Sequence, residues 1–254
     1  MKNKAVAVLF ASDEDSHLND LTIQRTTASL PFGGRYRLID FVLSNLVHAN
    51  ITKIGIITRN NYNSLMDHIR QGRDWDLNRK NSGISVYPPF VFNTAHDVYK
   101  GKIEALYMLR GFLMSSNEEY VVISNTNIAF NIDFDEVEKF HEEKGADITM
   151  LTYSTTDMTP RKLIVTADKN KRIKDLRFPV ASDTGKQLCN LNIYYVRKDL
   201  LISLIDNAYA HGAYDFEKDI VRASLNDLYV MSYEIDNYVA VIDRIPTYFK
   251  SSME

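Results

Sequence analysis

The sequence predicts an α/β domain with a mixed, mostly parallel sheet and helices on both faces. Two observations predict it. In the first half, apolar runs of strand length alternate with segments whose apolar residues recur about every 3.6 positions. In the second half, shorter runs follow one another with turn residues between them, which is typical of antiparallel or mixed strands. Because a strand–helix–strand order places successive strands parallel, the first half should supply the parallel part of the sheet.

The first half alternates predicted strands with predicted helices. Strands are expected at Ala5–Ala11, Lys53–Thr58, Glu119–Ser124 and Asp147–Tyr153. Helical spacing of apolar residues predicts helices at Ile39–Ala49, Tyr62–Arg70, Gly101–Met114 and Asp133–Lys144. Gly145 follows the last of these directly, at a position where glycine commonly ends a helix.

The second half contains shorter strands and two further helices. Strands are expected at Lys162–Thr166, Arg172–Phe178, Leu188–Val196, Leu228–Tyr233 and Tyr238–Ile242. Helices are expected near Lys198–Tyr209 and Asp215–Ser224. The sequence shows no internal repeat or proline-rich linker, so we expect residues 1–254 to form one domain.

Composition excludes several classes of protein. The chain has 254 residues, of which 45% are hydrophobic and 25% are charged, which is ordinary for a globular domain. One cysteine, Cys189, rules out an internal disulfide and fits a reducing cytoplasm. No apolar run approaches the ~20 residues of a membrane span. The net charge of −3 gives no reason to expect nucleic acid.

Two loops hold polar groups where ligands of open α/β sheets bind, at the carboxyl ends of strands. Ser12–His17 follows the first strand with three carboxylates and no glycine, although a phosphate-binding loop needs glycines for close backbone approach. A metal site and a solvated acidic loop both fit this pattern. Ser124–Asn127 offers only hydroxyls and amides.

The segment Pro31–Arg37 combines a Gly-Gly pair with two arginines. Such a combination can hold an anion, and it also fits a tight turn with surface arginines. The histidines are scattered, and neither a zinc-protease helix, a nucleophile elbow nor a Walker phosphate loop is present.

One block of sequence resembles a known enzyme family. Thr22–Arg25 is followed by Pro31–Asn45, which contains the run FGGRYRLIDFVLSN. This block resembles the glucose-1-phosphate adenylyltransferases, also called ADP-glucose pyrophosphorylases, of bacterial glycogen synthesis. The resemblance extends to Tyr248–Lys250 and covers nearly the whole chain. It implies a Rossmann-like nucleotidyltransferase domain that joins ATP and glucose-1-phosphate into ADP-glucose and pyrophosphate with magnesium.

The positions that carry catalysis in this family hold other residues here. The family's two metal-binding aspartates fall on Asn127 and on Val241, with Asp243 two residues from the second. The other replaced positions are the glycine-rich phosphate loop at Ser12–His17, a lysine at Thr27, the adenine-reading glutamine at Phe90 and the sugar-phosphate motif at Arg177-Phe178-Pro179. Metal assistance contributes several kcal/mol, and about 1.4 kcal/mol is tenfold in rate. We therefore expect no catalytic residue, no metal site and no cofactor in this chain.

Other positions match the family. Tyr194, Asp215 and Phe216 fall where the family lines its glucose pocket, which predicts a remnant sugar-phosphate site. Arg25 and Arg37 fall on basic positions that hold anionic effectors. The alternative for each is structural, with Tyr194 and Phe216 in the core and the arginines on the surface.

This mixture of retained fold and replaced chemistry resembles the GlgD-type subunit of Gram-positive bacteria. The resemblance implies a non-catalytic cytoplasmic subunit that joins the catalytic subunit in a heterotetramer and raises its activity, with magnesium bound only by that partner. It implies a sugar phosphate or anionic effector as a ligand, and neither nucleic acid nor membrane as a partner.

Two alternatives remain open at this point. An active enzyme would use Asp13–Asp15 as a replacement metal site, and a stand-alone sensor would bind a sugar phosphate without a catalytic partner. The family also carries a C-terminal left-handed β-helix domain, and the chain stops at Glu254, where the connection to it should begin. We therefore expect an N-terminal fragment of a longer protein.

Overall fold

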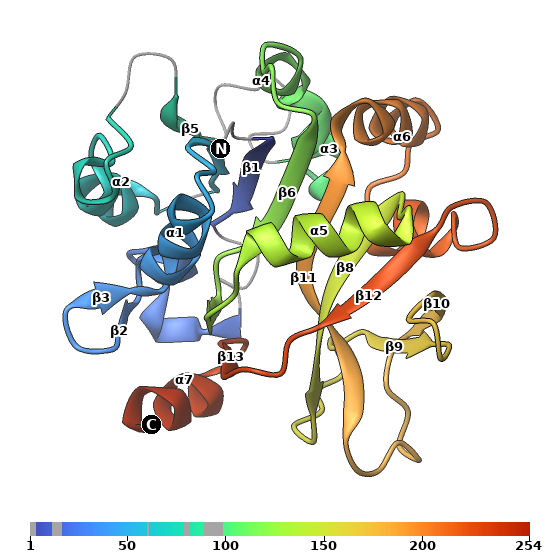
Figure 1. Cartoon of the computed structure of the whole chain (residues 1–254). Coiled ribbons are helices and arrows are strands. Elements are labelled where there is room, and N and C mark those ends of the chain that lie inside the picture. Colours follow the sequence, from blue (N-terminus) through green and yellow to red (C-terminus); the bar gives the residue numbers. More distant parts are fainter. Residues whose placement is uncertain (1–3, 12–16, 60, 79–81, 89–98) are drawn as a thin grey trace. The chain divides into compact units, whose positions relative to one another are not determined.

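A computed structural model of the chain describes residues 4–11, 17–59, 61–78, 82–88 and 99–254 (Figure 1). The chain folds into two units. Unit 1 comprises Met1–Tyr99, Ile123–Phe134 and Asn237–Glu254, and unit 2 comprises Lys100–Val122 and Asp135–Asp236. The prediction of one domain over the whole chain stays a prediction.

Unit 1 is built on parallel strands. β1 (Ala5–Phe10) pairs in parallel with β4 (Lys53–Ile57), and β4 pairs in parallel with β5 (Gly83–Tyr87). On its other side, β1 neighbours β6 (Tyr120–Asn125), so the order is β6-β1-β4-β5. Every residue of β1 is buried, which agrees with its unbroken apolar sequence.

Short elements surround this sheet. The helices of unit 1 are α1 (Leu38–His48), α2 (Asn63–Ile69) and α7 (Ile245–Met253). Its short strand pairs are β2 (Pro31–Phe32) with β3 (Tyr36–Arg37) and β7 (Ile128–Phe130) with β13 (Val239–Val241), both antiparallel. Leu30, Phe32, Leu38, Ala129 and Ile242 share one buried cluster, so the hairpin, α1 and the β7–β13 pair have a common core.

Unit 2 has a mixed sheet in the order β12-β8-β11-β9-β10. Its strands are β8 (Ile148–Thr155), β9 (Ile164–Ala167), β10 (Ile173–Arg177), β11 (Gln187–Arg197) and β12 (Val230–Glu234). β12 is parallel to β8, whereas β11 is antiparallel to both β8 and β9. Its helices are α3 (Lys102–Met108), α4 (Arg110–Met114), α5 (Phe134–Lys144), α6 (Lys198–Ala210) and a π-helical segment, Phe216–Arg222.

The predicted α/β class with a mixed sheet is confirmed. The structure differs from the sequence prediction in three details. The single helix expected at Gly101–Met114 is two helices, because Leu109 leaves helical geometry with ψ near 1°. The helix expected at Asp215–Ser224 is π-helical over Phe216–Arg222. β5, α7 and the short pairs β2–β3 and β7–β13 were either unassigned or incompletely assigned, because such short elements carry little periodicity.

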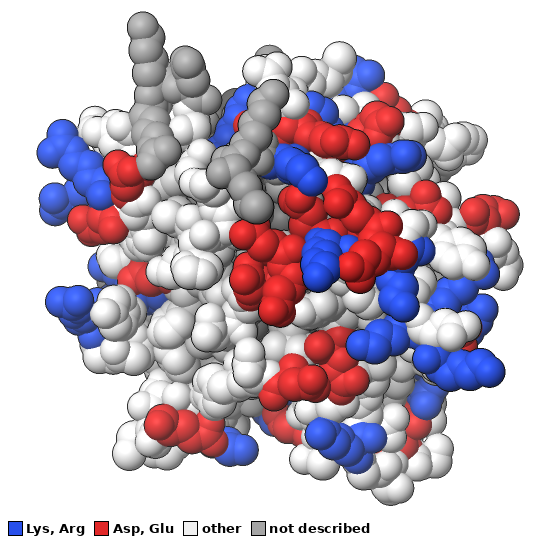
Figure 2. All heavy atoms as spheres, in the orientation of Figure 1, with Lys and Arg blue, Asp and Glu red and all other residues white. Residues whose placement is uncertain are grey.

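The acidic side chains of α5 face solvent. Figure 2 shows acidic atoms gathered over this helix, whose exposed carboxylates include Asp135, Glu136, Glu142 and Glu143. Such a face would repel a polyanion such as nucleic acid. Among the helices in the described parts of the chain, none has the length and hydropathy needed to cross a membrane.

A buried histidine makes unit 2 sensitive to acid. His141 is on the buried side of α5, 3% exposed, and its Nδ1 is 2.8 Å from the hydroxyl of Thr149. Burial lowers the pKa of His141 from 6.5 to about 4, although Asp147 and Glu142 act in the opposite direction. Between these two values only the unfolded chain binds the proton. Stability is therefore complete above pH 6.5 and falls by about 3 kcal/mol as the pH drops toward 4.

We expect the His141→Gln variant to lose most of this acid dependence, because glutamine does not titrate. The measurement is urea unfolding at neutral pH and near the lower pKa. The control is the same substitution at an exposed histidine, His211→Gln. Identical acid dependence in wild type and His141→Gln would contradict the assignment.

Candidate functional site

The segment after β6 is held by hydrogen bonds to two neighbouring strands. The backbone N–H and the hydroxyl of Thr126 both donate to the carbonyl of Phe10, at 3.2 and 3.1 Å. Asn127, 6% exposed, donates from Nδ2 to the carbonyl of Ile242 at 3.1 Å, and the Ile242 N–H donates back to the Asn127 carbonyl at 2.8 Å. The Asn127 side chain thus joins the end of β6 to the end of β13.

The second metal-ligand position of the sequence comparison lies beside the first. Val241 is opposite Ile128 in the β7–β13 pair, immediately beyond Asn127. Asp243 is 6% exposed and its Oδ1 lies 3.0 Å from the Thr247 hydroxyl and 3.2 Å from the Arg244 guanidinium. This carboxylate therefore belongs to the start of α7.

This pair of positions does not fit a magnesium ion. Mg²⁺ is held in proteins by carboxylates, and the two sites offer a neutral amide, whose nitrogen is bonded to the Ile242 carbonyl, and an aliphatic side chain. Within the described ranges, no group of three or more His, Cys, Asp or Glu side chains is placed to hold a metal. Asp13, Asp15, the other loop residues 12–16 and Phe90 lie outside the described residues.

Among the residues that the structure describes, this sheet edge contains buried polar atoms with no hydrogen-bond partner. They are Thr26 Oγ1, Thr58 Oγ1 after β4 and Asn125 Oδ1 at the end of β6. The backbone of the Thr26 segment also reaches this edge, since the Ala28 N–H donates to the Ala11 carbonyl at 3.2 Å. Unmade hydrogen bonds in a core are costly, so this edge retains polar groups that a water or a ligand would satisfy. Thr27, at the family's lysine position, is buried.

The three predicted sugar-phosphate residues lie together in unit 2. Tyr194 and Phe216 are at most 1% exposed, and their rings meet edge to face at 5.1 Å. The Tyr194 hydroxyl accepts from Asn190 at 2.6 Å and donates to Glu217 at 3.1 Å. Burial and the Glu217 carboxylate raise the pKa of Tyr194 well above 10. This is the arrangement that the core alternative predicts, and the sugar-phosphate role stays a prediction.

Two further polar contacts complete this region. Asp215 accepts a hydrogen bond from the Lys218 N–H at 2.9 Å and caps the π-helical segment. Glu217 also pairs with Lys102 of α3 at 2.7 Å, a partly buried ion pair that sequence reasoning missed. Its two members are 115 positions apart, so no local pattern signals it.

Phe178 stands where the family resemblance places the sugar-phosphate lysine. Phe178 is 57% exposed, and Arg177 before it binds both carboxylate oxygens of Asp183 at 2.7 Å. These hydrogen bonds, with one from the Val180 N–H, lower the pKa of Asp183 to about 2. The Arg177 guanidinium therefore stabilises the loop between Arg177 and Asp183.

The two predicted effector arginines do not share a pocket. Arg25 lines a pocket of about 420 Å³ together with Asp20, Leu21, Ile23, Gln24, Leu30, Pro31 and Tyr248. Its guanidinium has no hydrogen-bond or ion-pair partner within the described part of the chain. The Arg37 side chain instead donates to the carbonyl and hydroxyl of Ser64 on α2, at 2.6 and 2.9 Å. Arg25 thus lines a pocket, whereas Arg37 joins the start of α1 to α2, and the effector role of both arginines stays a prediction.

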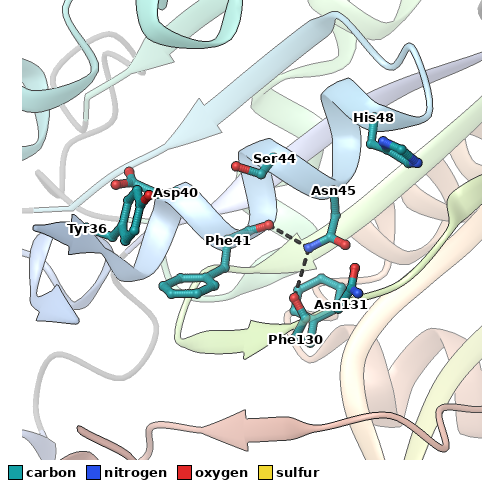
Figure 3. Close-up of a pocket in the computed structure, with 8 residues that line it drawn as sticks. All are labelled: Tyr36, Asp40, Phe41, Ser44, Asn45, His48, Phe130 and Asn131. Atoms are coloured by element: carbon teal, nitrogen blue, oxygen red, sulfur yellow. Dashed lines mark hydrogen bonds between the residues drawn. The ribbon is translucent and has the colours of Figure 1, made fainter. Parts of the chain in front are cut away.

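A second, larger pocket of about 580 Å³ lies along α1 (Figure 3). The sequence analysis missed this pocket because it considered only the apolar residues on the buried side of α1. The helix positions that line it are Asp40, Phe41, Ser44, Asn45 and His48. Their spacing of three and four residues is itself helical and marks a second face, which is the signal that would have found the pocket.

Comparison with known proteins agrees with this structure. The family model described as nucleotidyl transferase matches residues 6–239. The glycogen biosynthesis protein GlgD of Bacillus subtilis is 32% identical over 99% of the chain, which spans 63% of that protein. The glucose-1-phosphate adenylyltransferases of Clostridium acetobutylicum and Halalkalibacterium halodurans are 30% and 29% identical over the whole chain, which spans 67% of each.

Proposed function

Because the chain belongs to the nucleotidyl transferase family, with glucose-1-phosphate adenylyltransferases and GlgD as relatives, we propose that it is a non-catalytic regulatory subunit of glycogen biosynthesis. Its partner is a catalytic ADP-glucose pyrophosphorylase subunit in a cytoplasmic hetero-oligomer, expected to be a heterotetramer. It enhances that subunit's synthesis of ADP-glucose from ATP and glucose-1-phosphate. Magnesium is then bound by the catalytic partner alone.

The observation that carries this proposal is the side-chain bonding at Asn127. The Asn127 amide donates to the Ile242 carbonyl and so stabilises the end of β13. A carboxylate at this position would instead place a negatively charged oxygen against the carbonyl oxygen, which repels it. The local structure is therefore adapted to an amide. Val241, Thr27 and Phe178 also stand where the family resemblance places catalytic residues. No single substitution would bring all of these catalytic residues back. The retained fold therefore serves a role other than turnover.

A stand-alone sensor of a sugar phosphate or another anion is the second candidate. Arg25, which has no partner among the described residues, lines a pocket, and this favours an anionic ligand. A sensor of this kind would need no catalytic partner. In the regulatory proposal the same pocket would receive the effector that modulates the assembly.

The isolated chain is expected to form no ADP-glucose from ATP and glucose-1-phosphate with magnesium. It is also expected to co-purify with a catalytic relative when the two are expressed together. Magnesium-dependent turnover by the isolated chain would identify an active enzyme with a different metal site, such as one at Asp13–Asp15. Effector binding without any association would instead identify the sensor.

A further inference from the structure

The pocket along α1 lies within unit 1 and is separate from both predicted ligand regions. Figure 3 shows Ser44, Asn45 and His48 following one another along α1, with Phe130 and Asn131 opposite them. Tyr36 and Phe41 lie toward the start of the helix. Its volume of about 580 Å³ is within the range of pockets that hold small molecules.

The wall of this pocket is rigid. Asn45, 7% exposed, donates from Nδ2 to the carbonyls of Phe41 and Phe130 at 2.6 and 3.0 Å. Its Oδ1 accepts from the Ile132 N–H at 2.8 Å, so both the nitrogen and the oxygen of the amide are engaged. Asp40 is held between His68 Nε2 at 2.6 Å and the Arg37 N–H at 2.9 Å. These two residues fix the shape of the pocket because their own bonds hold them in place.

Three other lining groups are available to a ligand. Ser44, His48 and Asn131 are exposed and have no hydrogen-bond partner among the residues that the structure describes. A hydroxyl, an imidazole and an amide can each donate and accept hydrogen bonds. The remaining lining is aromatic, with the Tyr36 and Phe41 rings 6.3 Å apart at a steep angle of 68°. The pocket therefore combines ring surface with groups that donate and accept.

Charge narrows the class of ligand. The residues that line the pocket include no lysine or arginine, and they do include the Asp40 carboxylate. The lining therefore offers a phosphate neither a lysine nor an arginine, and the Arg35 guanidinium is engaged with Tyr36, 5.2 Å from its ring centroid and 3.3 Å from its hydroxyl. Both oxygens of this carboxylate already have partners, since Oδ1 lies 2.6 Å from His68 Nε2 and Oδ2 accepts from the Arg37 backbone N–H at 2.9 Å. A neutral ligand that carries both apolar surface and several hydroxyls matches the lining best.

We propose that this pocket binds an uncharged sugar, with an apolar ring face against the aromatic side chains and hydroxyls on Ser44, His48 and Asn131. The same chemistry belongs to a free hexose and to the end of a glucose polymer. The site is independent of the proposed regulatory function, and a non-catalytic chain of any role would still carry it.

The test is ligand-observed saturation-transfer NMR of the chain with glucose, maltotriose, glucose-1-phosphate and adenosine as separate probes. The double variant Ser44→Ala/Asn131→Ala is compared with wild type, and Asn63→Ala, an exposed asparagine on α2 outside the pocket, is the matched control. Urea unfolding of all three proteins verifies that folding is unchanged, which is expected because each altered side chain is exposed.

We expect saturation transfer to a neutral sugar in wild type and in Asn63→Ala. The double variant should bind at least ~10-fold more weakly, since two hydrogen bonds are lost. Equal affinity for glucose and maltotriose would identify a free sugar as the ligand, and tighter maltotriose binding would identify a polymer end. The proposal is overturned by absence of sugar binding, by unchanged binding in the double variant, or by preferred binding of glucose-1-phosphate or adenosine that the double variant abolishes.

Discussion

Replacing Gly101 with alanine is expected to destabilise the protein by about 3–5 kcal/mol. A Cβ at this position would lie 2.2 Å from the Tyr214 carbonyl oxygen and 2.9 Å from its carbon. The obstacle is backbone, so no side-chain rotation relieves it. The same carbonyl accepts a hydrogen bond from the Ile103 N–H at 3.3 Å, which binds the start of α3 to the Tyr214 segment. The φ of Gly101 is −165°, which any residue can adopt, so backbone strain does not require glycine here. Glycine is required because the Tyr214 backbone approaches so closely.

The matched control is Gly111→Ala in α4. A Cβ there meets nothing within 4 Å, and alanine favours helix more than glycine does. That variant is expected to be as stable as wild type or up to about 1 kcal/mol more stable. Urea unfolding of the three proteins measures both effects. Equal midpoints for Gly101→Ala and Gly111→Ala would show that the Tyr214 segment moves freely away from α3.

The second large effect is expected at Asn45, where Asn45→Asp should cost about 2–4 kcal/mol. The amide nitrogen donates to two carbonyls, and a carboxylate oxygen in its place would repel both. The introduced carboxyl would also be buried, which favours its protonated form and raises its pKa. The protonated form is still able to donate one hydrogen bond. The loss of stability should therefore be larger at neutral pH than near pH 4.

Ser44→Ala is the control for this change, because Ser44 is the exposed neighbour on the same helix. It should alter stability by less than about 0.5 kcal/mol. Chemical unfolding at the two pH values gives the comparison. A constant difference between Asn45→Asp and wild type at both values would mean that the introduced carboxyl reaches water, and that the amide does not close the contact between α1 and β7.

Sequence patterns predicted the long elements well and the short ones poorly. β1, α1, β8 and α6 were predicted because each repeats its apolar period over enough residues to be recognised. β5 was missed because its side chains are mostly half-buried and it opens on a glycine, so its pairing with β4 determines it. The helix expected at Asp215–Ser224 was confirmed over Phe216–Arg222, but its π-helical geometry was not predicted because its side-chain pattern is nearly that of an α-helix.

The candidate site was predictable only where family residues could be matched. The exchange of carboxylate for amide at Asn127 is visible in the sequence, but its bond to Ile242 is not, because the partners are 115 positions apart. The same limit applies to Arg25 and Arg37. Both match basic positions of the family, yet only the fold shows that Ser64 holds one of them and that the other lines a pocket.

The central claim is that this chain acts on a catalytic partner without catalysing the reaction itself. The measurement that tests it most directly is ADP-glucose synthesis by a catalytic relative while this chain is titrated in, with each protein also assayed alone. We predict that this chain alone forms no ADP-glucose. We also predict that the mixture forms ADP-glucose faster than the catalytic subunit alone, and that this rate saturates at a fixed ratio of the two proteins. Turnover by this chain alone, or a partner rate that stays unchanged at every ratio, would contradict the account.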